Sequence, residues 1–238
     1  KEKYNKNACK FIMYQWDSIS NYNYLPFLEY FEDVYTFDSK DSNYLKFKHN
    51  NSKYLALFYD ENAVQNNNNL VYLYDFAFIG GATVNRYEWL KIIKSYKVIS
   101  KYKVYVYMYL PFITFFFSLL KGKYFSLKSI SFFSMSLEEI SEIYQKTKVI
   151  IDLPHPDQSG LTMRTLEVIG GGNKLITSNL SISKEPFYHP NNILIINFKD
   201  YNWVSSVDSF ISMPYVEIDI QQYSLRNWIN IIFNNNEN

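Results

Sequence analysis

One stretch of the sequence, residues 147–179, limits what this chain can fold into more than any other. It opens with a β-branched apolar run, residues 149–151, followed by a polar loop with two prolines, which is typical of a buried strand and its exit loop. Apolar spacing over residues 160–168 predicts a helix, and the glycines at 170–172 predict its end, because glycine adopts left-handed backbone angles without steric cost. Residues 174–178 predict the next strand. This order of elements predicts a parallel α/β sheet.

The loop at residues 152–160 is the first candidate for a binding site, because ligands of parallel sheets bind at the carboxyl ends of strands. The helix start would offer free backbone N–H groups at residues 159–162, and Arg164 follows one turn later. Both favour a phosphate or diphosphate. Glu167 lies on a similar face and could accept hydrogen bonds from ligand hydroxyls, although Arg164 and Glu167 could also pair with each other.

The segment HPDQSGLTMRTLEVIGGGNKLITSN, residues 155–179, resembles the donor-binding segment of GT-B glycosyltransferases. The similarity is greatest to bacterial enzymes of lipopolysaccharide, capsule and exopolysaccharide assembly. The resemblance implies that Glu167 contacts the ribose hydroxyls of a nucleotide sugar. It also implies contacts to the diphosphate or sugar from the loop and helix start, namely Gln158, Ser159, Gly160, Leu161, Thr162 and Arg164. Ser159 stands where many family members have an acidic residue.

The amino-terminal residues predict a smaller unit of the same kind. Residues 10–16 and 33–37 predict strands, and residues 24–31 predict a short helix between them. This pattern resembles the last βαβ unit of the amino-terminal half of the same glycosyltransferases. We therefore expect a Rossmann-like α/β fold with a GT-B-type carboxyl-terminal domain and a partial amino-terminal domain, and we expect the chain to be a fragment or a processed form.

The resemblance also implies domain boundaries. They are residues 1–60 for the tail of an acceptor-side Rossmann-like domain with a crossing segment, 61–70 for a linker, and 71–238 for the nucleotide-sugar-binding domain with closing helices.

A glycine pair marks a second candidate ligand contact. Residues 74–79 predict a strand, and Gly80 and Gly81 predict a tight turn through which a ligand could approach the backbone. The turn would lead into a helix over residues 86–95, so Arg86 would lie in its first turn, within reach of a diphosphate. Such a turn could also serve packing alone. Lys174 is either a phosphate ligand or an exposed residue before its strand.

Two residues are candidates for catalysis. His155 follows a strand exit and could contact the sugar or transfer a proton, or it could be a structural loop histidine. Asp17 closes the first predicted strand, and from the opposite half it could serve as a catalytic base or contact the acceptor. His49 and His189 lack partners at metal-ligand spacing, so we expect no metal ion and no cofactor beyond the donor substrate.

Residues 104–120 form an uncharged run that Pro111 interrupts and that Lys121, Lys123 and Lys128 follow. Three interpretations stay open for this run: a buried strand with a packed helix, an interfacial membrane-binding patch, and a transmembrane helix. The interfacial interpretation, extended over residues 104–128, would suit an enzyme with a lipid-linked acceptor.

Composition excludes some classes of function. The net charge is +1, so nothing favours nucleic acid as a partner. Cys9 is the single cysteine, which excludes an intramolecular disulfide and favours a reducing cytoplasm. The interfacial interpretation of residues 104–128 would add peripheral contact with the cytoplasmic face of the membrane.

We expect transfer of a sugar from a nucleotide sugar to a growing cell-surface glycan, with a glycan or lipid-linked acceptor. The alternatives are a non-catalytic nucleotide-binding module, a membrane-associated polysaccharide-assembly protein and a two-domain epimerase.

Overall fold

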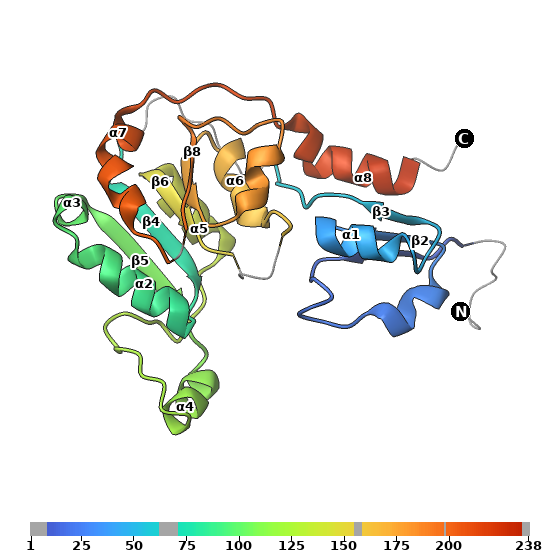
Figure 1. The fold of residues 1–238 in the computed structure, drawn as a ribbon, viewed down its shortest axis with the longest axis horizontal. Helices are drawn as coiled ribbons and strands as arrows, with labels where there is room; N and C mark the ends of the chain where they lie inside the picture. Colours follow the sequence, from blue (N-terminus) through green and yellow to red (C-terminus); the bar gives the residue numbers. More distant parts are fainter. Residues whose placement is uncertain (1–8, 62–70, 155–158, 198, 235–238) are drawn as a thin grey trace.

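A computed structural model describes residues 9–61, 71–154, 159–197 and 199–234. The chain forms two separate parallel sheets with flanking helices (Figure 1). The smaller sheet contains β1 (Ile12–Gln15), β2 (Asp33–Thr36) and β3 (Ser52–Tyr54) in the order β1-β2-β3. Its helices are a 3-10 helix at Leu25–Tyr30 and α1 (Ser39–Leu45). The predicted α/β class is confirmed.

The larger sheet has five parallel strands in the order β5-β4-β6-β7-β8. They are β4 (Tyr74–Gly81), β5 (Val104–Tyr109), β6 (Thr147–Asp152), β7 (Lys174–Thr177) and β8 (Ile193–Ile195). The central strand β6 has apolar neighbours on both faces: Ile150 belongs to one apolar cluster, whereas Val149 and Ile151 belong to the other. Burial on both faces explains why the sequence of this strand is an unbroken apolar run.

Helices cover both faces of the larger sheet. One face packs against α2 (Val84–Ser95), α3 (Lys97–Ser100) and α7 (Val207–Ser212). The other packs against α5 (Leu137–Gln145) and α6 (Met163–Gly170). Further 3-10 helices span Leu180–Lys184, Asn202–Ser206 and Gln221–Tyr223. A capping box begins α5, since Ser136 and Glu139 cap each other's backbone N–H groups.

The predicted turn at Gly80 and Gly81 was wrong. Both glycines are the last residues of β4 and pair with Met108 and Tyr109 of β5, so the strand runs two residues further than expected. Neither glycine has a positive φ, whereas Gly172, in the predicted glycine stop after α6, has a φ of 73°. The left-handed backbone that glycine favours is therefore needed after α6 and not after β4.

The uncharged run contains β5 and α4 (Phe112–Leu120). Of the three interpretations left open, the first is correct for the strand but not for the packed helix, because no residue of α4 is buried. Within the described part of the chain, no helix is long and apolar enough to cross a membrane.

The last helix, α8 (Leu225–Asn234), returns to the smaller sheet (Figure 1). Ser224 caps it, since its Oγ accepts a hydrogen bond from Asn227 N at 3.2 Å. The Trp228 ring of α8 contacts Tyr14 of β1 and Phe58, with ring centroids 4.8 and 4.9 Å apart. Helix α8 therefore packs against β1 of the smaller sheet.

One buried carboxylate joins the two sheets. Asp38 caps α1 directly after β2, and its Oδ1 accepts hydrogen bonds from Lys40 N at 2.9 Å and Asp41 N at 3.3 Å. The same side chain accepts bonds from Ser159 Oγ at 2.6 Å, Ser159 N at 2.8 Å and Gly160 N at 3.2 Å. Burial alone would raise the pKa of Asp38, but these bonds lower it below its ordinary value.

Gly160 allows this close approach. A Cβ at this position would lie 2.4 Å from Phe37 Cδ2 and 2.6 Å from the Phe37 carbonyl oxygen. A backbone oxygen cannot move aside as a flexible side chain can, so the contact between the two sheets requires glycine here.

We expect Asp38→Asn to lower the free energy of unfolding by about 2–3 kcal/mol at neutral pH, because an amide NH₂ would face N–H donors that now meet a carboxylate. The lowered pKa means that this stabilisation is present above about pH 4, the ordinary range of aspartate, and is lost as the pH falls through the folded-state pKa. Urea unfolding at several pH values measures both effects. The control is Asp17→Asn, an exposed carboxylate, and a difference that does not shrink in acid would contradict the prediction.

We expect Gly160→Ala to destabilise the fold by about 1–3 kcal/mol through overpacking against Phe37. Gly81→Ala is the matched control, since its Cβ would meet only Arg86 Nη1, at 3.9 Å. Thermal unfolding of the two variants compares them directly. Equal stability of both would show that the junction can relax around a methyl group.

Candidate functional site

The candidate site lies at the carboxyl edge of the larger sheet, where β6 ends and α6 begins. Asp152, the last residue of β6, is 1% exposed. Its Oδ2 accepts hydrogen bonds from Thr162 Oγ1 at 2.6 Å and Thr165 Oγ1 at 2.9 Å. Thr162 also caps α6 by accepting a bond from Thr165 N at 3.0 Å. The strand end and the helix start are thus fixed to each other.

Arg164, in the first turn of α6, reaches back over the end of β4. Its Nη1 lies 3.4 Å from Asp152 Oδ1, and a Cβ on Gly80 would lie 3.4 Å from the same nitrogen. Gly80 therefore leaves room for the guanidinium. Burial alone would lower the pKa of Arg164, but nearby groups, among them Asp152 and Glu167, raise it. A quarter of the side chain, 26%, is exposed, which leaves N–H donors for an anion.

Arg86, in the first turn of α2, lies nearby and is held by backbone carbonyls. Its Nε donates to Leu153 O at 2.9 Å, its Nη2 donates to the same oxygen, and its Nη1 donates to Gly81 O at 3.1 Å. Burial lowers the pKa of Arg86, and the charge of Arg164 lowers it further, whereas Asp152 opposes the shift. Of the five guanidinium N–H groups, two are left for a ligand.

Glu167 lies one turn after Arg164 on α6. Burial raises the pKa of its carboxyl, Arg164 opposes the shift, and the charge of Asp152 adds to it. Its carboxylate has no hydrogen-bond or ion-pair partner within the described ranges. A half-buried carboxylate with free acceptor atoms beside an arginine can accept hydrogen bonds from hydroxyl groups of a ligand.

Tyr144, in the last turn of α5, is a neighbour that sequence reasoning missed. Its ring is buried, and its hydroxyl interacts with the side chain of Arg164. Burial raises the pKa of Tyr144 to about 12, and the charge of Arg164 opposes the rise. Its place three residues before β6 hinted at burial, but nothing in the sequence pointed to a contact with Arg164.

The loop before α6 differs from expectation. The N–H groups of Ser159 and Gly160, predicted to be free for a diphosphate, donate to Asp38. Leu161 is 2% exposed and belongs to the core. Asp38, which follows a strand of the smaller sheet, accepts the hydrogen bonds of the Ser159 and Gly160 N–H groups. The local sequence around residues 159–160 does not reveal this contact. Gln158 and His155 lie outside the described residues.

Lys174 is not at this edge. It begins β7, so it lies at the amino edge of the sheet, away from the carboxyl ends of the strands. Its Nζ donates to Phe210 O at 2.6 Å and also to Met213 O, which satisfies carbonyls at the end of α7. Burial lowers its pKa. The prediction of a phosphate contact is corrected to a structural role.

Asp17 lies on the edge that faces the site. It is exposed at the carboxyl end of β1, and its carboxylate has no partner in the described part of the chain. Asp38 follows the neighbouring strand β2 and contacts residues 159–160, which follow β6. The carboxyl edges of the two sheets therefore face each other.

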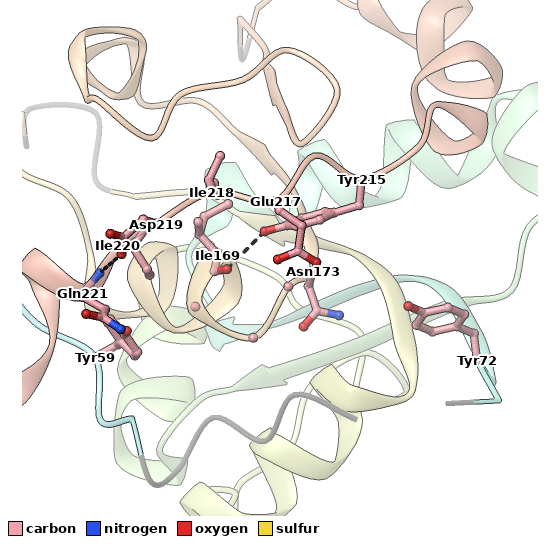
Figure 2. Close-up of a pocket in the computed structure, with 13 residues that line it drawn as sticks. Tyr59, Tyr72, Ile169, Asn173, Tyr215, Glu217, Ile218, Asp219, Ile220 and Gln221 are labelled. Atoms are coloured by element: carbon pink, nitrogen blue, oxygen red, sulfur yellow. Dashed lines mark hydrogen bonds between the residues drawn. The ribbon is translucent and has the colours of Figure 1, made fainter. Parts of the chain in front are cut away.

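A cavity of about 470 Å³ lies at the opposite end of α6 (Figure 2). It is bordered by the glycine stop and by the segment after α7, where Tyr215 donates to Ile169 O at 3.2 Å. Among the described residues, its charged lining residues are Glu217 and Asp219, and neither lysine nor arginine lines it. Two carboxylates would repel a diphosphate, so this cavity does not suit one. Across the described ranges, no group of three His, Cys, Asp or Glu side chains could hold a metal ion.

Sequence comparison does not identify the chain: no protein-family model matches it, and no curated protein matches it.

Solved structures do resemble it. Alr3699/HepE of Anabaena, in complex with UDP and glucose, has a TM-score of 0.56 at 9% identity, over 85% of this chain and 62% of that one. Sucrose-phosphate synthase from Thermosynechococcus elongatus has a TM-score of 0.51 at 10% identity, over 79% and 51%. TarM has a TM-score of 0.52 at 10% identity, over 91% and 46%. The chain thus spans about half to three fifths of these structures. At such low identity the likeness shows the fold alone, and that fold is the GT-B fold of glycosyltransferases.

Proposed function

We propose that this chain is the donor-binding part of a glycosyltransferase that moves a sugar from a nucleotide sugar to a growing cell-surface glycan, of the lipopolysaccharide, capsule or exopolysaccharide kind. The observation that carries the proposal is the unpartnered Glu167 carboxylate beside the partly exposed Arg164 guanidinium, at the carboxyl edge of the sheet. The Glu167 carboxylate would accept hydrogen bonds from sugar hydroxyls, and the Arg164 guanidinium would pair with the negative charge of the phosphates. The GT-B likeness, which includes a protein solved with UDP and glucose, supports the same substrate class.

The chemistry requires stabilisation of the leaving nucleoside diphosphate as negative charge develops on it. Arg164 supplies donors directly, and Arg86 supplies the two N–H groups that its backbone contacts leave free. The amino ends of α2 and α6 point to the same edge and add a favourable dipole. Glu167 orients the ribose. No step in this scheme requires a metal ion.

The acceptor hydroxyl needs a base on the opposite side of the donor. Asp17 is our candidate, because it is exposed and unpartnered on the facing edge. His155 is the second candidate. The acceptor in this proposal is a glycan or a lipid-linked glycan. A non-catalytic nucleotide-binding module would bind the same nucleotide at the same residues but would transfer no sugar when supplied with the complete protein, a donor and an acceptor.

We expect one of UDP, GDP, CMP and TDP to bind saturably, and Glu167→Gln to weaken its affinity about tenfold to hundredfold, equivalent to about 1.5–3 kcal/mol for lost charge-assisted hydrogen bonds. Isothermal titration calorimetry measures this. The control is Glu138→Gln, an exposed acid on α5. Because burial raises the pKa of Glu167, wild-type affinity should fall as the pH drops through that raised pKa, and the variant should show no such fall. Absence of binding to folded protein would refute the donor site.

Arg164 and Glu167 should contact different parts of the ligand. If UDP is the nucleotide that binds, we expect Arg164→Gln to weaken UDP about tenfold but to leave uridine unchanged, because uridine lacks the diphosphate. Glu167→Gln should weaken both. Retained uridine binding also shows that Arg164→Gln has folded, and an equal loss of both ligands would argue against a diphosphate contact for Arg164.

A further inference from the structure

The segment from α4 to residue 133 exposes a large amount of apolar side chain. Its members are between 36% and 81% exposed, and they are Phe112, Ile113, Phe116, Phe117, Leu119, Leu120, Tyr124, Leu127 and Phe133. Single exposed apolar residues are ordinary, but nine within 22 residues of sequence form a patch of the kind that marks an interaction site. We call this the α4 surface.

Little within the described chain covers the α4 surface. No residue of α4 is buried, and the helix projects from the larger sheet beyond the end of β5 (Figure 1). Phe132 contacts Phe112 and Phe115, with ring centroids 5.4 Å apart in both pairs. These contacts fix the helix from one side and leave the other apolar side chains in water, where their exposure costs free energy.

The charge around the α4 surface has one sign. Residues 110–137, which follow β5, contain three lysines and no acidic residue. Lys121, Lys123 and Lys128 are exposed, and none of the three has an ion-pair partner among the residues described. Lys128 also borders a cavity of about 200 Å³ together with Lys91 and Lys94 of α2. Unpaired cations beside exposed apolar rings complement an anionic lipid surface, where phosphate groups lie directly above acyl chains.

We propose that the α4 surface binds the protein to an anionic membrane, with α4 lying in the interface and the lysines on the lipid phosphates. A helix of nine residues is about 14 Å long, less than half of the hydrocarbon core of about 30 Å, so it lies in one leaflet and does not cross. The inference goes beyond the proposed sugar transfer and holds whether or not the donor site is active.

The place of α4 gives this membrane contact a direction. The helix follows the carboxyl end of β5 directly, with Pro111 as its N-cap. The carboxyl edge also carries Asp152 and Arg164, so a protein held by α4 presents the edge of its candidate site on the membrane side. A lipid-linked acceptor would need this orientation.

Vesicle flotation tests the proposal with the chain as it stands. We expect the wild type to float with vesicles of phosphatidylglycerol and phosphatidylcholine, and to float less with phosphatidylcholine alone. Phe116→Ser with Phe117→Ser should reduce the bound fraction about tenfold, since apolar insertion is lost. Phe47→Ser is the matched control, because Phe47 is 88% exposed on the smaller sheet's side of the chain. Lys121→Glu with Lys123→Glu should remove the preference for anionic lipid, and Lys184→Glu, another exposed lysine, should not.

Two results would overturn the proposal. The first is absence of vesicle binding by folded wild-type protein. The second is a dimer, detected by sedimentation velocity, that Phe116→Ser with Phe117→Ser abolishes while vesicle binding is unaffected, which would assign the α4 surface to a second copy of the chain. Because the substituted side chains are exposed, unchanged thermal unfolding separates loss of binding from loss of folding.

Discussion

The contact on which the rest of this structure depends is the buried carboxylate of Asp38. Asp38 follows β2 of the smaller sheet, caps α1 and accepts bonds from Ser159 and Gly160 in the loop after β6 of the larger sheet, so one side chain satisfies donors from two parts of the chain. A carboxylate this deeply buried is stable only while all of these donors stay in place. The two carboxyl edges are consequently held face to face, which is the arrangement that a donor on one side and an acceptor on the other require.

The same contact determines which groups are free to meet a ligand. The N–H groups at the start of the loop are used by Asp38, and the hydroxyls of Thr162 and Thr165 are used by Asp152. The side chains left to meet a ligand are those of Arg164, which is 26% exposed beside Asp152, and Glu167, whose carboxylate has no hydrogen-bond partner among the described residues. In this chain the backbone of the loop before α6 holds the two sheets together, and the side chains of α6 are left for the chemistry of the site.

Local patterns in the sequence predicted the elements whose causes are local. The apolar run at residues 149–151 predicted a strand that is buried on both faces, and the glycines at 170–172 predicted the end of α6. The predictions that failed concerned residues whose hydrogen-bond partners lie far away in the sequence. Asp38 lies 121 residues from Ser159, and Lys174 meets carbonyls 36 to 39 residues further along the chain. Apolar composition in α4 could not distinguish a core helix from an exposed one, because both are apolar in sequence.

The return of α8 has a consequence for motion. Tyr59 N donates to Tyr223 O at 3.0 Å, and Leu225 N donates to Tyr59 O at 2.9 Å, so the outgoing and returning segments run together as a two-stranded crossing. A single connecting strand could twist freely, whereas two strands bonded side by side resist twisting and bend as a unit. Any movement that separated the two sheets about this crossing would have to detach the amides of residues 159–160 from Asp38. Separation of the two sheets and loss of the hydrogen bonds to the Asp38 carboxylate are thus a single event.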